Sequence, residues 1–67
     1  MDFPPVTLWS DDVHRCVLRR NDEDGRFELL LHHEGRVIRL ETCTSEHDAR
    51  NKAHAWLIAL EELHHHH

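Results

Sequence analysis

The stretch from Thr44 to Leu63, TSEHDARNKAHAWLIALEEL, has the spacing of an amphipathic helix and decides how this chain can fold. Its apolar residues recur three or four positions apart and, at about 100° per residue, stay within one stripe. They are Ala49, Ala53, Trp56, Leu57, Leu60 and Leu63. The polar residues beside the stripe are Arg50, His54 and Glu61. Those nearly opposite it are Asn51 and Glu62. In a chain of 67 residues, this helix is expected to organise the core.

The start of the helix is marked by capping chemistry. Ser45 precedes Asp48 by three positions, which is the capping-box spacing with a shorter acid. Glu46 and Asp48 also complement the positive end of the helix dipole. Thr44 is equally placed to act as the cap.

Three segments before the helix have the mixed alternation of strands: 13–20, 26–33 and 36–43. The connections 21–25 and 34–35 contain Gly25 and Gly35 and are typical of hairpins. Both are too short for a crossover, so we expect an antiparallel meander in the order 1-2-3. With the helix packed on one face, the sequence predicts a two-layer α+β domain of the type β-β-β-α.

Side-chain chemistry selects a strand register. In the first hairpin, Leu18 opposite Leu29 keeps the apolar residues on one face, whereas a slip of one residue would place Leu18 opposite Glu28. In the second hairpin, a two-residue loop pairs Leu31 with Ile38, Leu29 with Leu40 and Phe27 with Thr42. The predicted sheet core is therefore Cys16, Leu18, Phe27, Leu29, Leu31, Ile38 and Leu40.

The two ends of the chain, 1–12 and 64–67, differ in composition from the single domain expected at 13–63. In residues 1–12, Phe3-Pro4-Pro5 is extended and cannot be helical, so this arm is a fourth strand, a strap over the core, or a segment exchanged with a second chain. Residues 64–67 are four histidines that resemble the remnant of a purification tag. Leu63 is either native or derived from the same vector.

Composition limits the kinds of partner. Thirteen acidic and eight basic residues give a formal charge of −5, which disfavours binding to nucleic acid. Six of the eight cations are nevertheless arginines between Arg15 and Arg39. No apolar run approaches the roughly 18 residues of a membrane span and no signal peptide is visible, so we expect a cytoplasmic protein without membrane contact.

Catalytic and metal-binding signatures are not found in the sequence. Its cysteines and histidines do not have the spacing of a zinc site, and its acids cluster in loops rather than in a buried pair. The register places Cys16 and Cys43 on opposite faces and outer strands of the sheet, too far apart for a disulfide. The sequence therefore predicts no enzyme, no metal and no cofactor.

The sheet face away from the helix is the surface that this pattern leaves unexplained. Three apolar residues lie on this face among arginines. We interpret the face as either an ordinary solvent-exposed surface or a binding surface. The predicted face carries Arg15, Val17, Arg19, Glu28, Leu30, His32, Val37, Arg39 and Glu41. Ile58 projects from the helix about 180° away from the core stripe. Together with the thin core expected of a small domain, these exposed residues predict a homodimer or another protein partner.

The order of strands and helix also resembles a known layout. Leu40-x-Thr42 entering a helix with Ala49, Ala53, Trp56 and Leu57 is similar to the DNA-binding domains of phage-type tyrosine recombinases and to plant ethylene-response domains. The resemblance implies an alternative role in which the exposed sheet face binds DNA through Arg15, Arg19 and Arg39. Glu28 and Glu41 on the same face, and the negative net charge, depart from that pattern.

Overall fold

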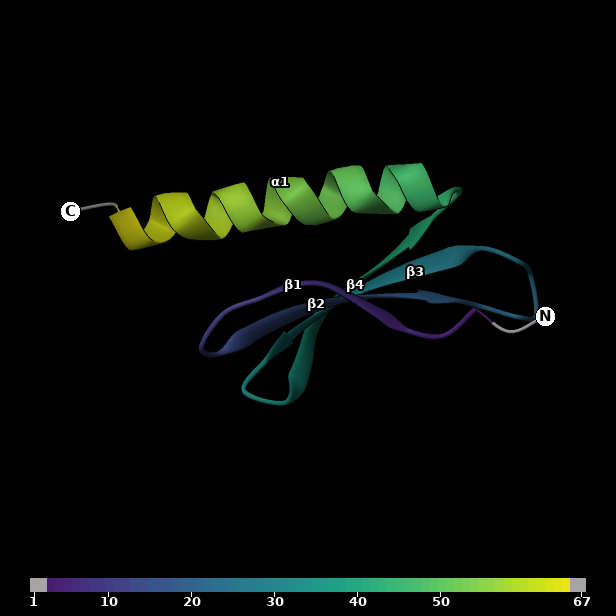
Figure 1. Ribbon diagram of the computed structural model, residues 1–67, viewed down its shortest axis with the longest axis horizontal. Helices are drawn as coiled ribbons and strands as arrows, with labels where there is room; N and C mark the ends of the chain where they lie inside the picture. The colour runs from purple at the N-terminus through teal and green to yellow at the C-terminus, as the bar shows by residue number, and fades with distance from the viewer. Residues whose placement is uncertain (1–2, 66–67) are drawn as a thin grey trace.

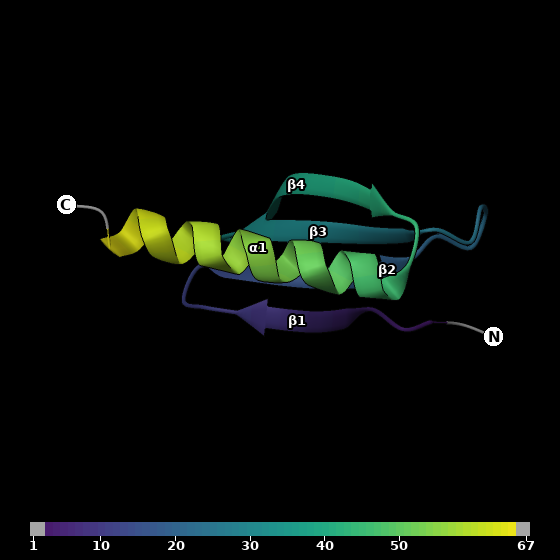
Figure 2. The same ribbon diagram turned by 90° about the horizontal axis from the view of Figure 1, so that it is seen from above.

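The computed structural model describes the backbone of residues 3–65 and the side chains of residues 3–63. It contains four strands and one helix: β1 (Val6–Ser10), β2 (His14–Arg20), β3 (Phe27–His33), β4 (Arg36–Cys43) and α1 (Glu46–His65). The strands form one antiparallel sheet in the order β1-β2-β3-β4, and α1 lies across one face of it (Figures 1 and 2). The α+β class is confirmed, whereas the prediction of three strands is wrong.

The additional strand, β1, comes from the N-terminal arm and pairs with β2 of the same chain. Pro4-Pro5 directly precedes Val6, the first residue of β1, and Asp11 lies in the turn into β2. The Asp11 carboxylate oxygen Oδ1 accepts hydrogen bonds from the backbone N–H groups of Val13 and His14, at 2.9 and 2.6 Å. Of the three alternatives for residues 1–12, the structure thus shows a strand for 6–10.

The β2–β3 hairpin has the predicted register, with Leu18 opposite Leu29 and Cys16 opposite Leu31. Its connection, residues 21–26, contains Gly25, whose φ of 72° lies in the region that glycine adopts without steric cost. Alternation along the strands then directs Cys16 and Leu18 toward α1 and Val17 away from it.

The β3–β4 hairpin begins in the predicted register and then departs from it. His33 faces Arg36 across a two-residue turn, Glu34-Gly35, in which both φ angles are positive. A bulge between Leu31 and His32 then shifts the pairing by one residue. Beyond it, the pairs are Leu31 with Arg39, Leu30 with Leu40, Leu29 with Glu41 and Phe27 with Cys43.

This bulge exchanges the two faces of β4, because a shift of one residue turns every later side chain to the other side of the sheet. Ile38 and Leu40, predicted in the core, are 55% and 52% exposed. Arg39 and Glu41, predicted on the outer face, lie on the helix side, where Arg39 stacks 4.7 Å from the Trp56 ring centroid. The side chain amine of Lys52 lies 3.5 Å from the Glu41 carboxylate.

The residues that form the core therefore differ in part from those predicted. Its buried residues are Cys16, Leu18, Leu29, Leu31, Cys43, Ala49, Ala53 and Trp56, with Phe3, Leu8, Trp9 and Phe27 packed against them. Cys43 is buried on the same face as Cys16, which corrects the prediction of opposite faces. The two thiols are free. Their positions are separated by two strand spacings and about four residues along the strands, roughly 16 Å.

The helix α1 begins after Ser45, whose hydroxyl oxygen accepts a hydrogen bond from the Asp48 N–H at 3.1 Å. Ser45 rather than Thr44 therefore caps the helix. The helix runs back over the sheet toward the β1–β2 and β3–β4 turns, and its C-terminal end extends past them (Figures 1 and 2). Leu63, predicted in the core stripe, is consequently exposed.

Among residues 3–65, no helix has the length and apolar character needed to cross a membrane.

Candidate functional site

The outer sheet face, defined as the face turned away from α1, is the first candidate surface. Strand alternation places on it six of the predicted residues: Arg15, Val17, Arg19, Leu30, His32 and Val37. Ile58 is 42% exposed on the helix, on the other side of the molecule. Arg39 does not belong to this surface, because the bulge turns it toward Trp56.

The centre of the outer sheet face is a row of three apolar side chains on adjacent strands. Val17 pairs with Leu30, and Leu30 pairs with Leu40. Leu30 is only 7% exposed although no described helix or strand covers this face. Leu40 is 52% and Val37 51% exposed beside it. The row lies outside the core cluster under the helix.

Sequence reasoning missed Leu40 as a member of this surface. The unbulged register places both Ile38 and Leu40 in the core, so counting apolar residues alone favours it. The bulge takes one residue out of the pairing, and no glycine or proline in β4 marks its position. The contact of Arg39 with Trp56 depends on the bulge and could not be foreseen without it.

Charges form the rim of the outer sheet face. Arg19 and Glu28 face each other across β2 and β3, with Arg19 Nε 2.8 Å from Glu28 Oε1. Arg15 lies opposite His32 toward the other end of the same two strands. Because Glu41 has left this face, Glu28 is the acid that the register places among these cations. The surface therefore has an apolar centre and a basic rim.

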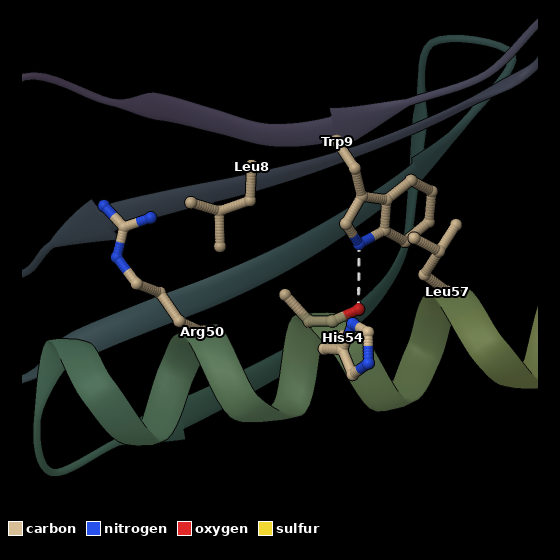
Figure 3. A pocket seen from close by; sticks show the side chains of 6 residues that line it. Leu8, Trp9, Arg50, His54 and Leu57 are labelled. Carbon is tan, nitrogen blue, oxygen red and sulfur yellow. Dashed lines mark hydrogen bonds between the residues drawn. The ribbon is translucent and has the colours of Figure 1, made fainter.

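A groove between β1 and α1 is the second candidate surface (Figure 3). Its volume is about 230 Å³, and it is lined by Leu8, Trp9, Arg50, Ala53, His54 and Leu57. Trp9 holds the strand to the helix, because its indole Nε1–H donates a hydrogen bond to the Ala53 carbonyl at 2.8 Å. The groove thus has an apolar floor and two basic side chains from α1.

The third candidate surface is a hollow of about 360 Å³ at the turns that join β1 to β2 and β3 to β4, and its lining is mostly polar. The Asp11 carboxylate in this hollow accepts hydrogen bonds from the backbone N–H groups of His14 and Val13. These hydrogen bonds lower the pKa of Asp11. His14 Nδ1 is buried 3.3 Å from Asp11 Oδ1 without the alignment of a hydrogen bond. Within residues 3–65, no three His, Cys, Asp or Glu side chains are placed to share a metal ion.

Both cysteine thiols lie in the core rather than at any of these surfaces. Desolvation raises the pKa of the Cys16 thiol to about 11. Burial also raises the pKa of Cys43, although the nearby ammonium of Lys52 acts in the opposite direction. A thiol with a raised pKa is a poor nucleophile, so neither side chain has the character of a reactive cysteine.

Comparison of this chain with models of protein families, with curated proteins and with solved structures finds no match.

Proposed function

We propose that this chain is a non-enzymatic interaction module that associates with a second copy of itself through the outer sheet face. The observation that carries the proposal is the row Val17–Leu30–Leu40, an apolar strip across three strands of a face that no described element covers. Exposed apolar patches with a polar rim are typical of protein interfaces. A two-fold axis through Leu30 would bring the row against itself.

The strand edges are less suited to self-association than the face. Both open edges, β1 and β4, are interrupted by bulges, between Thr7 and Trp9 in the first and opposite Leu31–His32 in the second. In addition, Arg39 and Glu41 project inward from β4 as charges. Bulges and inward charges are the features that protect sheet edges from pairing with another chain. These features favour stacking of two faces over extension of the sheet.

The core is small, so burial of further apolar surface by association would stabilise the folded chain. The core cluster contains eight buried residues, two of them alanine and two cysteine. A chain of this size buries only about 60% of its unfolded surface, which leaves little stability in reserve. Covering Val37 and Leu40 in an interface would add apolar burial that the monomer lacks.

Replacing Leu40 by glutamate tests the proposal, because the side chain is half exposed and the change does not disturb the core. We expect Leu40→Glu to lower the sedimentation mass at a concentration where the parent is associated. Val37→Glu should act in the same direction. Val13→Glu is the matched control, since Val13 is an exposed valine in the β1–β2 turn. A parent that stays monomeric over a hundredfold concentration range, or equal masses for Leu40→Glu and the parent, would contradict the proposal.

Binding of nucleic acid by the same face is the alternative proposal. It is supported by the basic rim, where Arg15 and Arg19 lie without Glu41 beside them. Two arginines, one of them paired with Glu28, provide fewer phosphate contacts than the three expected from sequence. A titration with short duplex DNA at low salt, followed by backbone amide NMR, tests it. Unchanged shifts at Arg15 and Arg19 would remove this alternative.

A further inference from the structure

We propose a second self-contact, in which the α1 helices of two copies pair antiparallel along the groove beside β1. The contact is separate from the outer sheet face, because α1 forms the other layer of the molecule (Figure 1). Two observations support this contact: the order of charges along one side of α1, and the apolar floor of the groove between Trp9 and Leu57.

The two flanks of α1 are unequal. On the β4 side, charged side chains make contacts between α1 and the sheet: Arg39 stacks on Trp56, and Lys52 lies 3.5 Å from Glu41. On the β1 side, the groove of about 230 Å³ stays open, with Leu8, Trp9 and Leu57 around it (Figure 3). The β1 flank is therefore the side on which an apolar surface is accessible.

The side chains along the β1 flank of α1 have a self-complementary order. Arg50, His54, Leu57 and Glu61 are spaced i, i+4, i+7 and i+11, which keeps them within an arc of about 60°. A cation stands at one end of this stripe and an acid at the other, about 16 Å apart along the helix. Arg50, His54 and Glu61 are exposed, and the C-terminal end of α1 projects beyond the turns (Figure 1).

An antiparallel second helix matches this order. A two-fold axis midway between Arg50 and Glu61 places each arginine opposite the glutamate of the other copy, and brings His54 and Leu57 of both copies to the centre. A parallel pair would instead oppose like charges. Arg50 Nε already bonds to Glu46 Oε2 at 2.9 Å, and the remaining guanidinium N–H groups stay available as donors.

The dimensions of the groove also favour a second copy over a small ligand. Small-molecule sites are usually about 300–1,000 Å³, and this groove is smaller and open. An apolar side chain such as Leu57 from another copy suits a shallow site of this kind. Ile58, predicted from sequence as an interaction residue, borders the same stripe and would lie at the edge of the contact.

Charge reversal in a Leu40→Glu background tests the helix contact, because that background removes the proposed sheet contact. In it, we expect the chain to remain dimeric in sedimentation. Arg50→Glu or Glu61→Arg alone should weaken this dimer by roughly tenfold or more, since each creates two like-charge pairs. The double variant Arg50→Glu/Glu61→Arg should restore the affinity of the Leu40→Glu chain. Glu62→Arg makes the same charge change on another side of α1 and should leave the affinity unchanged.

The outcomes separate the two contacts. A Leu40→Glu chain that is monomeric at all concentrations overturns the helix contact and leaves the sheet contact supported. Single reversals without effect, or a double variant no tighter than the singles, also overturn it. Equal masses for Leu40→Glu and the parent, combined with rescue by the double variant, support the helix contact and contradict the sheet contact. Far-ultraviolet circular dichroism of each variant verifies that α1 is intact, and the same reversals in the parent background provide a second measurement.

Discussion

At the residue scale, burial determines the chemistry of Cys16 and Cys43. Desolvation raises both thiol pKa values, to about 11 at Cys16, so the thiolate that reacts with alkylating agents is scarce near neutral pH. We expect neither cysteine to be alkylated by iodoacetamide in the folded protein, and both to react after unfolding in urea. Mass spectrometry of the labelled chain measures this. Rapid native labelling at Cys16 would contradict the buried position.

Individual residues also show where sequence reasoning succeeds. Cys16 and Leu18 were predicted in the core because Leu29 and Leu31 stand opposite them, and both are fully buried. Cys43 was predicted on the outer face and is buried instead. The prediction succeeds for Cys16 and Leu18 because the β2–β3 hairpin is uninterrupted. It fails for Cys43 because this residue follows the bulge in β4.

At the scale of the elements, the β3–β4 register makes a direct prediction about stability. Leu29 is 0% exposed and Ile38 is 55% exposed. We expect Leu29→Ala to lower the free energy of unfolding by about 2–5 kcal/mol, because it leaves a cavity in the core. Ile38→Ala should cost less than about 1 kcal/mol. Urea unfolding measures both changes. A loss at Ile38 as large as that at Leu29 would indicate the unbulged register.

The elements differ in how completely local sequence defines them. The apolar spacing predicts the helix α1, and the apolar pairs predict the β2–β3 hairpin. The sequence left Thr44 and Ser45 as alternative caps, and the hydrogen bond from the Asp48 N–H selects Ser45. Residues 6–10 allowed three placements, since a short apolar segment after two prolines can be a strand, a strap or an exchanged arm. Pairing with β2, and the hydrogen bond from Trp9 to Ala53, decide among them in the structure.

At the scale of the whole molecule, self-association predicts that stability depends on concentration. A state that forms only between folded copies stabilises the folded chain by mass action. We expect the Tm of the parent to rise by roughly 5 °C for each tenfold increase in concentration, given the size of the chain. The dependence should be weaker in Leu40→Glu. Differential scanning calorimetry at several concentrations measures it, and a constant Tm in the parent would argue against any dimer.

The sequence by itself determined the α+β class, the C-terminal helix and its apolar stripe, and the register of the central hairpin, because these depend on local periodicity and on apolar pairs close in the chain. Only the tertiary structure decided the fourth strand and the faces of Ile38, Arg39, Leu40 and Glu41. The fourth strand depends on its pairing with β2 and on the hydrogen bond from Trp9 to the Ala53 carbonyl. The physical reason for the exchanged faces is the bulge in β4. It exposes two apolar residues but allows Arg39 to stack on Trp56 and Cys43 to be buried. Such contacts between distant segments are not encoded in the alternation of any one strand.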